Sequence, residues 1–178
     1  MNPEATLKNR IKDIKRLQCG GILSEFPQTW NEKADKLNKL TLKTQQAADK
    51  YQQSYLGWAY KGFGNFDGES SLIDENTGDS RFEMEKLYSR TFAPAVAGKI
   101  MEYKFNDNDY SFYLEYRINS AATLPTVIKV QRRIYYPDGF NITIVPPSWA
   151  ESTEINQNTI HIVHTLDARD DENYKLDT

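Results

Sequence analysis

The chain has 178 residues, enough for one domain of ordinary size or for a small domain with part of a second. Its aromatic content of 12% excludes a disordered chain, and its net charge of −3 gives no general reason to expect a nucleic-acid partner. No apolar run is long enough to form a transmembrane segment, and the charged N-terminus lacks the pattern of a signal peptide, so the sequence indicates no compartment. The single cysteine, Cys19, excludes an internal disulfide, and we expect it to be a small buried side chain.

Helical and strand patterns alternate over residues 5–60. Apolar residues at spacings of four and three predict an amphipathic helix over residues 5–17, which two glycines end. A short apolar run over residues 22–26 predicts a buried strand. A second helix over residues 32–53 and a second strand over residues 55–60 are expected to follow. This alternation implies that the two strands pair in parallel.

The pattern changes in the second half of the chain. Residues 62–79 are rich in Gly, Asp, Ser and Asn and predict a loop, and residues 81–88 predict a short helix. From residue 99 the apolar residues recur with a period of two, which predicts an antiparallel β-sandwich. The expected strands are residues 110–118, 126–131, 140–145 and 159–165, with a turn at YPDG, residues 136–139.

These patterns divide the chain into residues 1–92, residues 93–165 and an acidic tail over residues 166–178. Two βα units cannot cover a sheet or close a barrel on their own, since a (β/α)8 barrel needs about 250 residues. Residues 1–92 are therefore expected to be the C-terminal end of a larger α/β domain, most of which lies outside this sequence.

One carboxylate has an unusual setting. Glu25 follows the short apolar strand within GGILSEFPQTW, with a proline two positions later. From its position alone, two interpretations are open. Glu25 is either an exposed acid where a strand runs into a loop, or a catalytic group at the C-terminal end of a barrel strand, where barrel enzymes place their active sites.

Four segments in sequence order resemble glycoside hydrolase family 5 and, within it, the endoglycoceramidases: LSEFPQTW, SYLGWAYKGFG, LYSRTFAPAVAG and YYPDGFNITIV. The resemblance covers roughly residues 18–165. It implies a (β/α)8 TIM barrel followed by a C-terminal β-sandwich, and it implies that this chain supplies the last two βα units of the barrel and the sandwich.

The resemblance also assigns candidate site residues. Glu25 matches the catalytic nucleophile, and Trp58, Tyr60 and Lys61 match the substrate-binding motif of strand eight. The chain departs from the family at several positions. Ser24 and Pro27 stand where Thr and Gly are usual, and Tyr55 and Gly57 replace two aromatic residues, which removes possible stacking area.

A retaining glycosidase needs a second carboxyl group as acid and base, about 5 to 5.5 Å from the nucleophile. In the family this group is the Glu of an N-E-P motif, and no N-E-P occurs here; Asn31 and Glu32 are followed by Lys33. We therefore expect the isolated chain to be inactive. The resemblance implies a glycosphingolipid or β-glucoside substrate for the complete enzyme, and no metal or organic cofactor.

The alternative is a non-enzymatic β-sandwich module that binds carbohydrate or a partner. Trp58 would then be a core aromatic and Lys61 a solvated cation. His161 and His164 are three apart on an expected strand and so face opposite sides, which argues against a shared metal site.

Overall fold

The computed structural model describes residues 2–27, 34–62 and 70–165. The chain divides into two compact units, one made of residues 1–89 with 104–109 and the other of residues 90–103 with 110–178. The division at residues 92 and 93 drawn from the sequence stays a prediction, and the acidic tail, residues 166–178, lies outside the described residues. Among the described residues, no helix has both the length and the apolar character needed to cross a bilayer.

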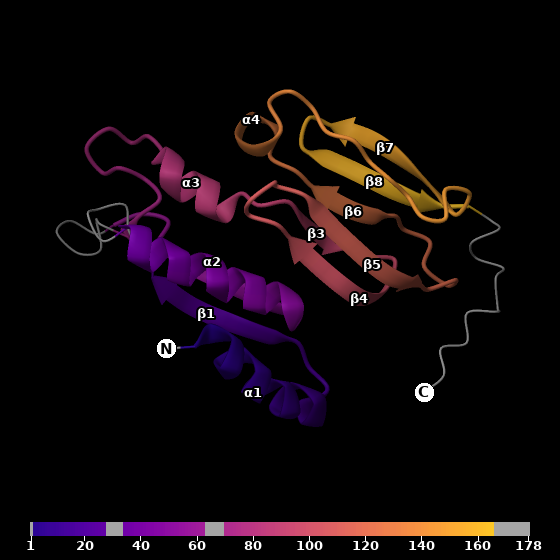
Figure 1. Ribbon diagram of the computed structural model, residues 1–178, viewed down its shortest axis with the longest axis horizontal. Coiled ribbons are helices and arrows are strands. Elements are labelled where there is room, and N and C mark those ends of the chain that lie inside the picture. The colour runs from indigo at the N-terminus through magenta and orange to yellow at the C-terminus, as the bar shows by residue number, and fades with distance from the viewer. Residues whose placement is uncertain (1, 28–33, 63–69, 166–178) are drawn as a thin grey trace. The chain divides into compact units, whose positions relative to one another are not determined.

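Helices and strands alternate in the first unit as the sequence predicted, but the strand expected to be buried over residues 22–26 exposes Ile22, Ser24 and Glu25. The elements are α1 (Pro3–Leu17), β1 (Gly21–Pro27), α2 (Ala34–Lys50), β2 (Gln53–Trp58) and α3 (Phe82–Tyr88) (Figure 1). β1 and β2 pair in parallel, which confirms the predicted pairing. The start of α1 is fixed by Asn2, whose side chain accepts a hydrogen bond from the amide of Ala5, and by Pro3 in the first turn.

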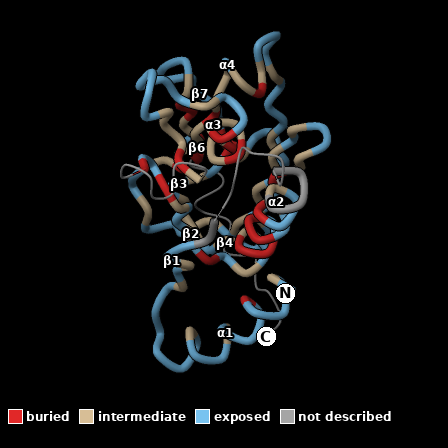
Figure 2. Tube along the Cα trace, turned by 90° about the vertical axis from the view of Figure 1, so that its left-hand side faces the viewer, coloured by how far each residue is buried: buried red, intermediate tan, exposed pale blue. Residues whose placement is uncertain are grey.

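The core of this unit lies between α1, α2 and one face of the sheet. Leu7, Ala47 and Ala48 form a buried cluster, and Tyr51 and Tyr55 pack against it. We call this group the helical cluster. Figure 2 shows that α1 is exposed along most of its length, and Leu7 is its buried residue. The apolar stripe that predicted α1 is thus only partly covered.

The second unit is built from antiparallel pairing. Its elements are β3 (Phe92–Ala95), β4 (Gly98–Phe105), β5 (Phe112–Ile118), β6 (Thr126–Lys129), α4 (Arg132–Tyr135), β7 (Ala150–Asn156) and β8 (Thr159–His164), the last residues of β4 belonging to the first unit. One sheet has the order β3-β6-β8-β7 with antiparallel neighbours, and β4 and β5 form a separate sheet. Its core cluster consists of Val130, Ala150, Ile160 and Ile162.

Three predictions for the second unit are confirmed. In β5 the residues from Phe112 to Ile118 alternate between partly buried and exposed, as a period of two requires. The YPDG turn is closed by a 3.0 Å hydrogen bond from the amide of Gly139 to the carbonyl of Tyr136. His161 and His164 differ in burial, as expected of two residues on opposite sides of a strand. His164 is buried and its Nε2 lies 2.7 Å from the Tyr116 hydroxyl, whereas His161, three residues earlier on β8, is only partly buried.

Other expectations were wrong. Residues 140–145 are not a strand, because Phe140 and Ile144 pack over the core cluster while their backbone stays irregular. The edge strand β7 was missed because all its residues except Ala150 are exposed, and its sequence shows no apolar alternation. Cys19 is exposed, since it lies in the connection between α1 and β1 at the surface.

Candidate functional site

The β1–β2 sheet has one covered and one open face. On β2, Gln53 donates a 3.0 Å hydrogen bond to the carbonyl of Leu7, and Tyr55 packs against the helical cluster. The alternate residues point the other way, and Leu56 is 55% exposed. On β1, Ile22 is 61% exposed. We call the face that carries Ile22, Ser24, Ser54 and Leu56 the open face.

An extra residue in β1 decides where Glu25 lies. Leu23 pairs with Tyr55, but the next register pair is Phe26 with Gly57. Ser24 and Glu25 therefore stand together opposite the single residue Leu56, which is the arrangement of a β-bulge. Without the extra residue, Glu25 would follow Leu23 onto the covered face. With it, Glu25 shares the open face with Leu56, and it is exposed.

Tyr88 packs beside Gly57 near the end of β2, although Gly57 itself is exposed. A Cβ at this position would overlap the hydroxyl group of Tyr88, so the Tyr88 side chain occupies the space that any larger residue would need. Burial raises the pKa of Tyr88 well above its ordinary value. Tyr55 thus packs on the covered face, and Tyr88 fills the space beside Gly57. The expectation that these two positions remove stacking area stays a prediction.

The other candidate residues follow at the end of β2. Trp58 is partly buried, continues the alternation of Ser54 and Leu56, and is the register partner of Pro27. The Trp58–Ala59 peptide bond is cis. Tyr60 is 70% exposed. Lys61 is exposed, and its backbone forms an isolated parallel β-bridge with Ile73. The fold therefore gathers the four candidate residues at the C-terminal ends of two adjacent parallel strands.

Glu32, expected at the start of a helix, lies outside the described residues. Within residues 2–27, 34–62 and 70–165, no group of three or more His, Cys, Asp or Glu side chains is arranged to hold a metal ion. Glu25 could be named as a candidate from the sequence. The bulge could not be predicted, because neither serine nor glutamate is characteristic of a bulge.

Known proteins resemble this chain both in sequence and in fold. Residues 90–176 match the family model described as glycoside hydrolase family 5 C-terminal domain. Endoglycoceramidase of Cyanea nozakii is 25% identical over 150 residues, which cover 82% of this chain and 29% of that protein. Endoglycoceramidase of Hydra vulgaris is 28% identical over 138 residues, covering 77% of this chain and 26% of that protein.

A solved structure shows the same fold. Endo-glycoceramidase II from Rhodococcus sp., determined as a lactosyl-enzyme intermediate, superposes with a TM-score of 0.69 at 16% identity over 93% of this chain and 35% of that one. The chain therefore spans about a quarter to a third of the length of these relatives. The resemblance to glycoside hydrolase family 5 and to endoglycoceramidases is confirmed.

Proposed function

Because the chain is endoglycoceramidase-like and residues 90–176 match the C-terminal domain of glycoside hydrolase family 5, we propose that it is the C-terminal part of a retaining glycosidase. Residues 1–92 would be the last two βα units of a (β/α)8 barrel, and residues 93–165 the β-sandwich that follows it. The complete enzyme would hydrolyse the O-glycosidic bond that joins a sugar to ceramide or a similar lipid aglycone.

The bulge in β1 is the observation that carries this proposal. It brings the Glu25 carboxylate onto the open face at the C-terminal ends of two parallel strands, which is the edge where barrel enzymes bind substrate. The same face carries Ile22 and Leu56, both apolar and more than half exposed. Apolar side chains of this kind fill the interior of a closed barrel. Two of the four residues that define the open face, Ile22 and Leu56, are thus of the kind that fills a barrel interior, which supports the proposal.

In this role, Glu25 attacks the anomeric carbon and forms a covalent glycosyl ester as the aglycone oxygen leaves. The second carboxyl group protonates that oxygen and then removes a proton from the water that hydrolyses the ester. We assign this group to the part of the barrel that the 178 residues do not include. The lactosyl-enzyme intermediate of the Rhodococcus relative is the species that such a mechanism forms, and this supports the assignment.

Trp58, Tyr60 and Lys61 would bind the sugar next to the cleaved bond. The indole of Trp58 offers an apolar plane, with an N–H at its edge, that can stack on a sugar ring. The hydroxyl of Tyr60 and the ammonium group of Lys61 can donate hydrogen bonds to sugar hydroxyls. Their place at the end of β2, beside the strand that carries Glu25, supports these roles.

Complementation tests the proposal. The isolated chain is expected to release no fluorophore from a β-glucoside and no ceramide from a glycosylceramide, since its acid/base is missing. A chimera in which this chain replaces the matching C-terminal part of the Hydra vulgaris endoglycoceramidase is expected to hydrolyse both. Turnover by the isolated chain that is lost in Glu25→Gln would contradict the expected need for a second segment.

A further inference from the structure

The backbone after β2 is held by a second segment of the chain. The amide of Ala59 donates to the carbonyl of Ser70 at 3.0 Å, and the amide of Leu72 donates to the carbonyl of Ala59 at 2.8 Å. The amide of Ile73 donates to the carbonyl of Tyr60 at 3.0 Å. Residues 70–73 thus run beside residues 59–61, directly after Trp58. We call residues 70–73 the support segment.

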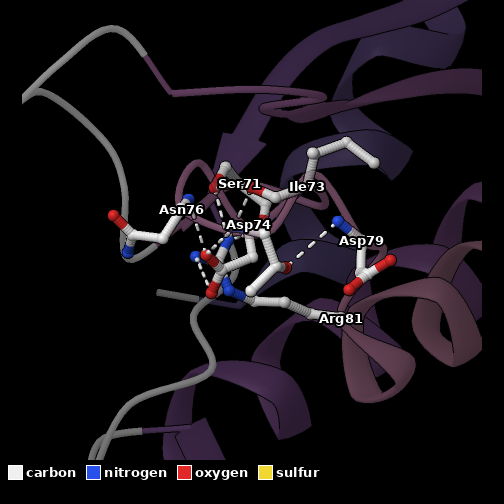
Figure 3. Close-up of polar contacts among 7 residues, drawn as sticks. Ser71, Ile73, Asp74, Asn76, Asp79 and Arg81 are labelled. Atoms are coloured by element: carbon white, nitrogen blue, oxygen red, sulfur yellow. Dashed lines mark hydrogen bonds and ion pairs between the residues drawn. The ribbon is translucent and has the colours of Figure 1, made fainter.

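One side chain fixes the support segment from behind (Figure 3). The Arg81 guanidinium donates to the carbonyl of Ser71 at 2.8 Å, to the Ser71 hydroxyl at 2.5 Å and to the carbonyl of Ile73 at 2.9 Å. Its main-chain amide donates to the carbonyl of Leu72 at 2.8 Å. The Arg81 side chain is only 14% exposed, so these bonds are largely shielded from water.

Asp74 holds the guanidinium in place. Its Oδ2 lies 3.2 Å from a terminal nitrogen of Arg81, and its Oδ1 accepts hydrogen bonds from the amides of Asn76 and Thr77. Figure 3 shows both sets of contacts converging on the one carboxylate. The loop is closed by a 2.9 Å hydrogen bond from the amide of Asp74 to the carbonyl of Asp79. The Arg81 guanidinium and the Asp74 carboxylate together hold the support segment, and we call this ion pair the clamp.

We propose that Arg81, anchored by Asp74, is a positioning residue that fixes the sugar-binding end of β2 through the support segment. Arg81 bonds the segment from one side, the segment bonds residues 59–61 from the other, and Trp58, Tyr60 and Lys61 are held in register as a result. One terminal nitrogen of the planar guanidinium, Nη1, bonds the support segment while the other, Nη2, reaches the Asp74 carboxylate, and the single nitrogen of a lysine cannot reproduce this division. The proposal rests on the proposed function only for what the positioned side chains bind.

Amide hydrogen exchange of the 178-residue chain, followed by NMR, tests this clamp without any substrate. In Arg81→Gln, we expect the amides of Ala59, Leu72 and Ile73 to exchange about tenfold faster or more, because hydrogen bonds from a charged group are lost. The Trp58 indole N–H signal should shift or broaden in the same variant. Arg81→Lys should give intermediate rates, since it keeps the charge and loses the fork.

Leu7→Ala is the matched control. It weakens the helical cluster and lowers the stability of the same unit without touching the clamp. In this control the three amides should accelerate no more than the amides of α2. The proposal is overturned if Arg81→Gln leaves the three amides and the Trp58 signal unchanged, or accelerates them only in step with α2, as Leu7→Ala does. Neither of these results would depend on whether Glu25 is a nucleophile.

Discussion

Glu25 and Gly57 show how single residues set the two faces of one small sheet. Glu25 is on the open face because β1 has one residue more than β2 between two register pairs. Gly57 has no Cβ and so leaves room for the ring of Tyr88 beside β2. A strand-end acid could be predicted from the sequence, since it follows an apolar run. The face of the sheet on which this acid lies could not be predicted, because a register shift of one residue moves a side chain to the opposite face.

Replacing Gly57 with alanine should destabilise the chain. The added Cβ would overlap the Tyr88 hydroxyl oxygen and the ring carbon that bears it, so the ring or the strand must move. We expect the free energy of unfolding to fall by about 1–3 kcal/mol, as for overpacked cores, measured by denaturant titration. Gly20→Ala is the control, because a Cβ there meets nothing within 4 Å. Equal stability of the two variants would show that Tyr88 does not occupy this position.

Asp74 should make the stability of the chain depend on pH in a defined direction. Hydrogen bonds from the amide of Asn76, then of Thr77, together with the charge of Arg81, lower its pKa below the ordinary value. A lowered folded-state pKa stabilises the fold above the unfolded-state value, which is about 3.9, and this contribution is lost as the pH falls through the folded-state value.

Thermal melts of the wild type and of Asp74→Asn measure this contribution. The wild type should melt at a higher temperature near neutral pH, and the difference should shrink below about pH 4. Glu151→Gln, an exposed change on β7, controls for the loss of one acidic charge. A difference that grows as the pH falls would contradict the sign of the pKa shift.

At the scale of elements, the two faces of the β1–β2 sheet should differ in what they contribute to stability. Leu7 is buried in the helical cluster, so Leu7→Ala should lower the free energy of unfolding by about 2–5 kcal/mol. Leu56 lies on the open face, so Leu56→Ala should change it by no more than about 0.5 kcal/mol. Denaturant titration of both variants measures the contrast. A cost for Leu56→Ala as large as that for Leu7→Ala would mean that this face is covered in solution.

Two elements that the sequence predicted, α1 and β5, show a periodic pattern of apolar residues. The apolar stripe of α1 and the alternation of β5 report directly on which side is buried, and both were located correctly. β7 was missed because its pairing with β8 uses backbone groups, which any sequence supplies. Residues 140–145 alternate as a strand does, but Phe140 and Ile144 cover the sheet rather than join it.

At the scale of the whole molecule, the resemblance to endoglycoceramidases is confirmed, and the structure adds the geometry on which the proposed role of Glu25 rests. The two parallel strands leave the apolar side chains of Ile22 and Leu56 exposed on their open face. Under the proposed function these strands are the edge of a larger barrel, whose remaining strands would cover Ile22 and Leu56 and supply the acid/base. The four motifs identified this relationship because they occur in the family's order, although each motif alone is short.

Covalent trapping in the chimera with the Hydra vulgaris endoglycoceramidase tests the central claim most directly. A 2-deoxy-2-fluoro glycosyl donor with a good leaving group forms the glycosyl ester and is hydrolysed slowly, so mass spectrometry of the digested protein can locate the sugar. We expect a single adduct on the peptide that contains Glu25, and none in Glu25→Gln, whose turnover should fall by a factor on the order of 10⁴ or more. An adduct on another carboxylate, or one that persists in Glu25→Gln, would contradict the assignment of Glu25 as the nucleophile.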